Sequence, residues 1–428
     1  MNSISSALAS SQPTASMMST IPQEVVDHII DYFHDDRKTL VSTSYVCPSW
    51  HASSRAHLFY RIDLTVPDPL YGDYDDGHFV TPPSPLKKYQ RLYGLLVHDR
   101  GIANAVKELT ISNAHQLGPS AWASVEPTLA LILCKLHCVR VIRLSEVYFN
   151  HLKPDFQNAL SQVCSSSTVS LLDISNCNSL TWSTFDDITG APNGLRSLRM
   201  AFVRAQNASL GFVKEEPPLF LVKPQSLTIE SSLDPVITWL MHPYSTVSLS
   251  DLRELRLTHL ENIPNLNDLV YGLLDVAGGS LEYLELWAPS GKCSTGGPPP
   301  GPMGKLADIN LTPNLQELRI AGLHFSRQVC LVAAATVFLI GATAPLNLRK
   351  FSILANVESD SPKGHDLDWA AWKGLDEVLS GPLFKPFEKL EVTMLIQGQG
   401  IPEHYRANLV EQFPRLHERK ILSVIIEH

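Results

Sequence analysis

Apolar and polar positions near the start of the chain predict a run of short helices between Ile21 and Leu64. The first begins at the sequence IPQE from Ile21, where proline suits the first helical turn and a carboxylate lies near the positive end of the helix dipole. It runs to about Phe33 and carries apolar residues at Val25, Val26, Ile29, Ile30 and Phe33. These positions cover a wider arc than one buried stripe. We therefore expect one side of the helix to pack inward and the other to bind a partner.

Two further helices are predicted in the same stretch. The acidic pair Asp35 and Asp36 is a candidate cap for a second helix that runs through Tyr45, and Pro48 suits the first turn of a third that reaches Leu58. A unit of about forty residues seldom builds a sufficient core without disulfides, a metal or a partner. The alternative is that these are ordinary helices of an all-α cap.

Several positions in this stretch occur in a recognisable order. The chain reads Ile21-Pro22-x-Glu24, then Ile29 and Leu40, then Val46-Cys47-x-x-Trp50 and Phe59. This order resembles the F-box, in the version common in mushroom-forming fungi. The segment LYGLLVHDRGIANAVKEL, from Leu92 to Leu109, is similar to the segment after the F-box in those proteins. There are two departures, because Ile21 stands where the family usually has leucine and Pro48 comes directly after the cysteine.

The resemblance implies a partner and a function. It implies docking to a Skp-family adaptor and, through it, to a cullin-based ubiquitin ligase, in which this chain would be a non-catalytic substrate receptor for an unknown target protein. The residues that the resemblance assigns to adaptor binding are Ile21, Pro22, Glu24, Val25, Ile29, Leu40, Val46, Cys47 and Trp50.

The larger part of the chain shows a repeat with the pattern apolar-x-x-apolar-x-apolar. It recurs at Val106-Leu109-Ile111, Val139-Ile142-Leu144, Val169-Leu172-Ile174, Leu195-Leu198-Met200, Leu252-Leu255-Leu257, Leu281-Leu284-Leu286, Leu315-Leu318-Ile320 and Leu348-Phe351-Ile353, with weaker units at Leu227-Ile229 and Leu390-Val392. One short strand roughly every thirty residues is typical of a leucine-rich-repeat-like α/β solenoid. Residues 59–64 are a candidate additional first strand. An unrelated α/β fold with similar strand spacing is the alternative.

The predicted organisation has four parts. Residues 1–19 are a serine-rich disordered tail, 20–64 the F-box, 65–88 an acidic proline-rich loop and 89–428 the solenoid. A second loop is predicted from Ser290 to Gly304. The fold class is therefore α/β, with a small three-helix unit followed by the repeat array.

Charge and composition exclude several classes of partner. The net charge is -9 and the basic residues are scattered, so we expect binding neither to nucleic acid nor to anionic membranes. The longest apolar run, Val329 to Ala344, is too short to span a bilayer. The seven cysteines have irregular spacing, which favours a reducing compartment, the cytoplasm or the nucleus.

No motif for catalysis or for a cofactor is found. The cluster of Cys134, His137 and Cys138 lacks a second pair to complete a zinc site, and neither a nucleophile elbow nor a dinucleotide-binding glycine pattern occurs. We therefore expect no enzyme activity, metal or cofactor. Two rivals to the receptor hypothesis stay open: a protein-binding scaffold outside any ligase, and an enzyme whose site is assembled across repeats.

Alternation along the predicted strands indicates which side chains line the concave, strand-lined face. The central row is Thr110, Arg143, Asp173, Arg199, Thr228, Arg256, Glu285, Arg319, Ser352 and Glu391. Neighbouring strands lie about 4.8 Å apart, so the alternating charges form either a self-compensating ladder or a recognition patch.

One predicted strand differs from the others because it places two aromatic residues on this face. Tyr283, Glu285 and Trp287 would project together beside Arg256 and Arg319, and such residues dominate interface energetics. These five are the candidate substrate-binding residues. The alternatives are the opposite register, or a Trp287 covered by the loop after it. Arginines on this face permit an acidic or phosphorylated target segment.

Overall fold

The computed structural model describes residues 21–66, 85–113, 119–189, 194–205, 221–231, 233–258, 266–287, 309–324, 336, 338–358, 369–397 and 404–427. The chain divides into two units, one up to Tyr60 and one from Arg61 onward. The predicted serine-rich tail, most of the predicted loop 65–88 and the predicted loop from Ser290 to Gly304 lie outside the described residues.

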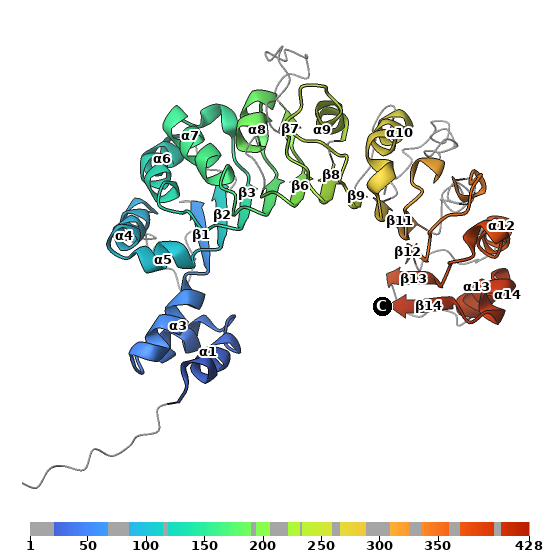
Figure 1. Ribbon diagram of the computed structural model, residues 1–428, viewed down its shortest axis with the longest axis horizontal. Helices are drawn as coiled ribbons and strands as arrows, with labels where there is room; N and C mark the ends of the chain where they lie inside the picture. Colours follow the sequence, from blue (N-terminus) through green and yellow to red (C-terminus); the bar gives the residue numbers. More distant parts are fainter. Residues whose placement is uncertain are drawn as a thin grey trace, which may run out of the picture. The chain divides into compact units, whose positions relative to one another are not determined.

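The first unit contains three helices: α1 (Gln23–Asp31), α2 (Arg37–Thr43) and α3 (Pro48–Leu58) (Figure 1). Their predicted starts are confirmed. Pro22 precedes α1, and Pro48 occupies the first turn of α3. The side chain of Asp36 accepts hydrogen bonds from the backbone N–H groups of Lys38 and Thr39, so two otherwise unpaired donors at the start of α2 are satisfied.

The core of the first unit is small. Its fully buried apolar residues are Val26, Ile30 and Leu40, with Phe33, Trp50 and Leu58 partly buried around them. Polar contacts complete the seam between α1 and α3: Ser53 donates a hydrogen bond to Asp27, and His57 Nε2 lies 2.7 Å from Asp31 Oδ1. Since apolar burial is limited, these polar contacts help to fix the two helices against each other.

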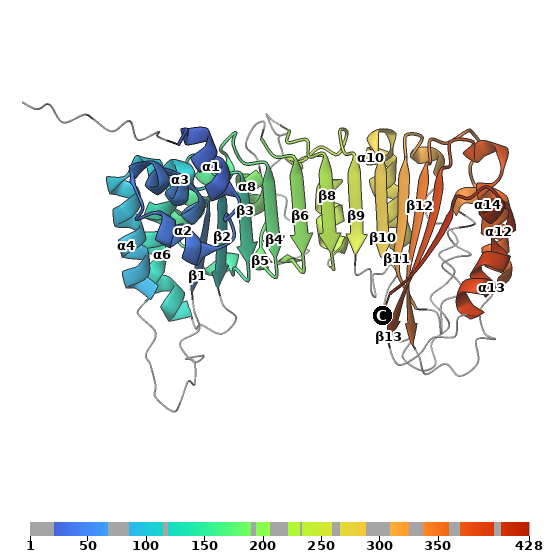
Figure 2. The ribbon, with the colours of Figure 1, turned by 90° about the horizontal axis from the view of Figure 1, so that it is seen from below.

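The second unit is built on a parallel sheet of twelve strands, in the order β1-β2-β3-β4-β6-β8-β9-β10-β11-β12-β13-β14 (Figures 1 and 2). The bounds are β1 Arg61–Val66, β2 Glu108–Asn113, β3 Val141–Ser145, β4 Leu171–Ser175, β6 Ser197–Ala201, β8 Ser226–Glu230, β9 Glu254–Thr258, β10 Tyr283–Trp287, β11 Glu317–His324, β12 Lys350–Glu358, β13 Lys389–Gln397 and β14 Leu422–Glu427. A second sheet pairs β5 (Asn178–Leu180) with β7 (Arg204–Ala205).

Helices alternate with these strands and lie along one face of the large sheet (Figures 1 and 2). They are α4 Pro85–His98, α5 Arg100–Ala105, α6 Pro119–Leu133, α7 Pro154–Cys164, α8 Trp182–Thr189, α9 Leu233–Leu240, α10 Leu266–Ala277, α12 Trp369–Leu379, α13 His404–Gln412 and α14 Pro414–Glu418. We call the opposite face of the sheet the inner face. Four short 3-10 helices complete the described elements: Phe149–His151, Gly278–Ser280, Ile309–Leu311 and Pro382–Phe384.

The predicted repeat units are confirmed by the register of the sheet. The middle apolar residue of each unit pairs with its counterpart, as in Leu227 with Leu255 and Leu255 with Leu284. All three are fully buried. A buried leucine contributes about 1.5–3 kcal/mol relative to an exposed one, so this row beneath the helices is a main source of stability in the second unit.

Several strands are followed by a turn of the same backbone conformation. Glu146, Asn176, Phe202 and Ser231 have positive φ angles of 60°, 52°, 50° and 42° directly after β3, β4, β6 and β8. The N–H group of Asn176 donates a 2.8 Å hydrogen bond to Ala201 O, and Phe202 makes the equivalent bond to Glu230 O at 2.9 Å. Because these bonds stabilise the left-handed conformation, the turn does not require glycine.

Two predicted boundaries need correction, and one strand was not predicted. The first unit was predicted to reach residue 64, but β1 begins at Arg61 and pairs with β2 up to Val66, because the candidate first strand is a full member of the sheet. Both ends of the predicted loop 65–88 belong to regular elements. Its first residues are part of β1, and its last residues are part of α4, which begins at Pro85, before the predicted solenoid start at residue 89. The last strand, β14, was not predicted.

No helix within the described ranges combines the length and the apolar character that crossing a bilayer requires.

Candidate binding surfaces

The first helix carries an apolar stripe on its exposed side. Ile21 lies just before the N-cap of α1, and Val25, Ile29 and Tyr32 follow one another at intervals of four and three residues, a spacing that places side chains on one helix face. Their exposed fractions are 56%, 47%, 36% and 86%. We call these four residues the N-terminal apolar stripe. The other side of α1 carries the buried Val26 and Ile30, so both sides of this short helix are apolar.

Other predicted adaptor-binding residues are also exposed. Pro22 and Glu24 flank the start of the stripe, and Val46 and Cys47 lie between α2 and α3. Val46 is 62% exposed, and the neighbouring Tyr45 is 83% exposed.

Two predicted adaptor-binding residues pack into or against the core of the first unit. Leu40 is only 2% exposed, because α2 turns it toward Val26 and Ile30, and Trp50 packs partly buried against the same core. Conversely, sequence reasoning did not include Tyr32, although its position three residues after Ile29 continues the exposed stripe.

The inner face of the second unit carries the predicted central row in the predicted register. Arg143 pairs with Asp173, Asp173 with Arg199, and further along the sheet Glu285 lies between Arg256 and Arg319. Neighbouring side chains largely compensate one another's charge. Arg143 Nη1 lies 2.8 Å from Glu108 Oε2, and Arg199 Nη2 lies 2.8 Å from Glu230 Oε1.

Asp173 is the carboxylate between the first two arginines of this row. Burial raises the pKa of its carboxyl group above the ordinary value, and the positive charges of Arg199 and Arg143 oppose that shift. The separation between Arg199 Nη1 and Asp173 Oδ2 is 3.6 Å, and Asp173 Oδ1 has no hydrogen-bond partner among the described residues. The guanidinium group of Arg199 is therefore held mainly by Glu230.

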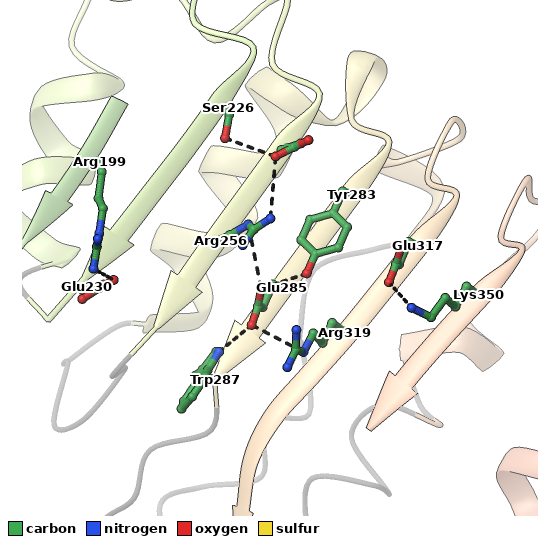
Figure 3. Close-up of polar contacts among 11 residues, drawn as sticks. Arg199, Ser226, Glu230, Arg256, Tyr283, Glu285, Trp287, Glu317, Arg319 and Lys350 are labelled. Carbon is green, nitrogen blue, oxygen red and sulfur yellow. Dashed lines mark hydrogen bonds and ion pairs between the residues drawn. The ribbon is translucent and has the colours of Figure 1, made fainter. Parts of the chain in front are cut away.

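Glu285 is the centre of a second cluster, on β10 (Figure 3). The hydroxyl of Tyr283 donates a 2.8 Å hydrogen bond to Glu285 Oε2, and Trp287 Nε1 donates a 2.7 Å hydrogen bond to Oε1. Glu285 itself is only 4% exposed, while the two aromatic side chains remain half-buried. The predicted common side of these three residues is confirmed, so the opposite register does not apply.

Two arginines from the neighbouring strands complete this cluster, which we call the Glu285 cluster: Arg256, Tyr283, Glu285, Trp287 and Arg319. Arg256 Nε lies 3.9 Å from Glu285 Oε2, and Arg319 Nε lies 3.6 Å from Oε1. The Cζ atom of Arg256 lies 5.0 Å from the centre of the Tyr283 ring, within the range of a cation–π contact. The arginine side chains are 44% and 37% exposed.

The pKa of Tyr283 reports this environment. The pKa of its hydroxyl is raised from 10.0 to about 12, chiefly by burial, and the hydrogen bond to Glu285 and the charge of Glu285 act in the same direction. Arg256 and Arg319 oppose the shift. The phenol is thus held in its neutral, donating form.

These contacts assign different roles to the predicted substrate-binding residues. Glu285 accepts hydrogen bonds from its own neighbours and is buried, so it positions the other side chains and has little accessible surface of its own. Arg256, Arg319, Tyr283 and Trp287 retain the accessible surface of the cluster.

The second unit also has a polar groove away from this cluster. It has a volume of about 440 Å³ and lies at the starts of β8 to β12, where Gln225, Arg253, Glu282 and Gln316 line it. Its carboxylate Asp251 has a lowered pKa, chiefly because Ser250 donates a hydrogen bond to it. Among the described residues, no group of three or more His, Cys, Asp or Glu side chains is arranged to hold a metal ion.

Comparison with known proteins gives no family. No protein-family model matches the sequence, and no curated protein matches it significantly.

Proposed function

We propose that this protein is a substrate-receptor subunit of a Skp/cullin/F-box ubiquitin ligase. The first unit binds a Skp-family adaptor, which links it to a cullin, and the inner face of the second unit binds a target protein. The chain itself is not catalytic. Other subunits transfer ubiquitin, and this chain accelerates the transfer by raising the effective concentration of target lysines near the enzyme.

The observation that carries the proposal is the N-terminal apolar stripe. Large apolar side chains seldom form a continuous exposed row on a small soluble unit unless a partner covers them. Here the row lies on a helix whose opposite face already forms the core, with Val26 and Ile30 buried. Anchors at intervals of three and four residues are typical of a helix that lies in the groove of another protein.

The second unit supports the target-binding half of the proposal. Its repeats place arginine and aromatic side chains next to one another on the inner face, as in Arg256 beside Tyr283. Tyr, Trp and Arg are the residues most often found at the energetic centres of protein interfaces. A parallel array of strands also presents a surface long enough to receive an extended segment.

Adaptor binding by purified proteins tests the proposal. We expect the wild-type chain to co-elute with a Skp-family adaptor in size-exclusion chromatography. The double variant Val25→Asp/Ile29→Asp introduces charge into the stripe, and its affinity measured by calorimetry should fall at least about a hundredfold.

Val97→Asp is the matched control. Val97 lies on α4 in the second unit and is 46% exposed, against 47% for Val25, so it introduces the same charge at an equally exposed helical valine. Val97→Asp should bind the adaptor as tightly as wild type. A wild-type chain that fails to co-elute, or a Val25→Asp/Ile29→Asp variant that still binds tightly, would contradict the proposal and favour a scaffold that works outside a ligase.

A further inference from the structure

The four arginines of the central row differ in what their guanidinium groups contact. Arg143 Nη1 and Arg199 Nη2 each donate a 2.8 Å hydrogen bond to a glutamate. The contacts of Arg256 and Arg319 with Glu285 are longer, 3.9 and 3.6 Å, and both run through Nε. Charge-assisted hydrogen bonds of guanidinium groups are about 2.7–2.9 Å long. Arg143 and Arg199 thus each have one terminal N–H group in a short bond to a carboxylate, whereas Arg256 and Arg319 make only longer contacts with carboxylates.

Arg319 has fewer carboxylate neighbours than Arg256, and its side chain also forms a hydrogen bond with the hydroxyl of Tyr283. Arg256 Nη2 has a second carboxylate neighbour, Glu254 Oε2 at 3.8 Å. In the described part of the chain, Glu285 is the one carboxylate that forms an ion pair with Arg319. The same oxygen of Glu254 accepts a 3.3 Å hydrogen bond from the hydroxyl of Ser226.

Both guanidinium groups are held in place before any ligand arrives. Arg256 lies over the ring of Tyr283, and the hydrogen bond from Tyr283 to Glu285 fixes that ring. Arg319 lies on the other side of the same buried carboxylate (Figure 3). Because part of the side-chain entropy is already lost in the free protein, binding a ligand here costs less.

We propose that Arg256 and Arg319 bind an oxyanion, a carboxylate or a phosphate, carried by an extended segment of a target protein. The planar guanidinium group matches both anions with paired donors. The two arginines project from strands on either side of β10, about 10 Å apart at the backbone, with the Tyr283 and Trp287 rings between and beside them. This inference rests on the proposed function in one respect: it takes the ligand of the inner face to be a protein. The net charge of -9 disfavours a polyanion such as nucleic acid.

Selection from a library of random, unstructured peptides displayed on phage tests the chemistry with the full-length chain. We expect peptides retained by the wild-type protein to be enriched in Asp and Glu. The enrichment should disappear with the double variant Arg256→Gln/Arg319→Gln and persist with Arg199→Gln. Arg199 is the matched control, since it lies in the same row and is 47% exposed but already donates its hydrogen bond to Glu230.

The strongest retained peptide then serves as the probe in fluorescence anisotropy. It is compared with a version in which Gln replaces each acidic residue, a version in which phosphoserine replaces them, and a single-stranded oligonucleotide. Arg319→Gln should weaken binding of the acidic peptide about tenfold or more. Arg319→Lys should restore only part of that affinity because lysine lacks the paired donors of a guanidinium group. Tighter binding of the phosphoserine peptide would identify phosphate as the source of the oxyanion, and tighter binding of the acidic peptide would identify carboxylate.

Several results would overturn the inference: no retained peptide, no acidic enrichment, equal binding of the Gln-substituted peptide, equal loss in Arg199→Gln, or preference for the oligonucleotide. Thermal unfolding of each variant separates loss of binding from loss of fold. The experiment contains no adaptor, so its failure would leave the adaptor-binding half of the proposed function standing. Failure of adaptor binding would likewise leave a positive peptide result intact.

Discussion

The hydroxyl of Tyr283 donates a 2.8 Å hydrogen bond to Glu285 Oε2, two residues further along the same strand. Trp287 does the same to the other carboxylate oxygen, from the opposite direction along β10. A carboxylate that is 4% exposed would be costly without such partners. The aromatic hydrogen bonds and the two flanking arginines explain how a charge is accommodated on this part of the sheet.

Removal of this carboxylate should destabilise the second unit. Glu285→Ala leaves the Tyr283 hydroxyl, the Trp287 N–H and two arginines without their shared acceptor, and we expect the free energy of unfolding to fall by about 2–3 kcal/mol. This value is below the roughly 3–5 kcal/mol expected for a fully buried pair because both arginines are partly exposed. Urea denaturation followed by tryptophan fluorescence measures the change.

Glu282→Ala is the control for this experiment. Glu282 also pairs with an arginine, Arg253 at 3.5 Å, but its side chain is 43% exposed. Its removal should change stability by less than about 0.5 kcal/mol. Equal losses in Glu282→Ala and Glu285→Ala would show that the burial of Glu285 does not matter.

The pKa of Tyr283 predicts a dependence on alkaline pH. The folded pKa is about 12, above the value of 10.0 for a free phenol. The contribution of the neutral phenol to stability is therefore complete below pH 10 and is lost as the pH rises from 10 through 12. The tyrosinate absorbance of wild type minus that of Tyr283→Phe, recorded during a titration, reports this group directly.

Glu285→Gln provides the second half of that test. The amide keeps an acceptor for the Tyr283 hydroxyl but removes the negative charge that favours the neutral phenol. The pKa of Tyr283 should therefore fall toward that of a free phenol. An unchanged titration would mean that burial alone sets the pKa.

The strand rows could be predicted from the sequence because each repeat carries the same pattern. Leu255 and Leu284 each lie three residues after a leucine and two before another, and the register of the sheet pairs them. Charge on the inner face could be predicted in the same way, as with Arg256 beside Glu285. The last strand, β14, was not predicted because Arg419 stands three residues before Leu422, where most of the other units have an apolar residue.

Burial of individual side chains could not be predicted, because it depends on tertiary neighbours. Glu285 has the sequence context of an exposed strand residue, and side chains from its own strand and from the two neighbouring strands converge on it. Leu40 was placed on the adaptor-binding surface, but the direction in which the short α2 faces α1 buries it. Neither effect leaves a pattern within one repeat or one helix.

Substitutions at the adjacent residues Leu40 and Val41 test the packing of α2 against α1. Leu40→Ala removes a large part of a core with few members, so it should cost about 2–5 kcal/mol and unfold the first unit. Val41 is 40% exposed, and Val41→Ala should cost less than about 1 kcal/mol. Hydrogen exchange of residues 21–60 measures both changes, and exchange protection in Leu40→Ala equal to that of wild type would contradict the observed core.

Cysteine reactivity should separate buried from exposed thiols in the native chain. Burial raises the pKa of the Cys164 thiol and of the Cys177 thiol to about 12 in each case. Alkylation requires the thiolate, so at neutral pH both should resist iodoacetamide until the second unit unfolds. Cys47 and Cys134 are exposed and should be labelled within minutes, which makes them internal controls in the same sample. Mass spectrometry of peptides after labelling in the absence and presence of urea distinguishes the two groups. Native labelling of Cys177 at the rate of Cys134 would mean that the turn after β4 opens far more often than its hydrogen bonds imply.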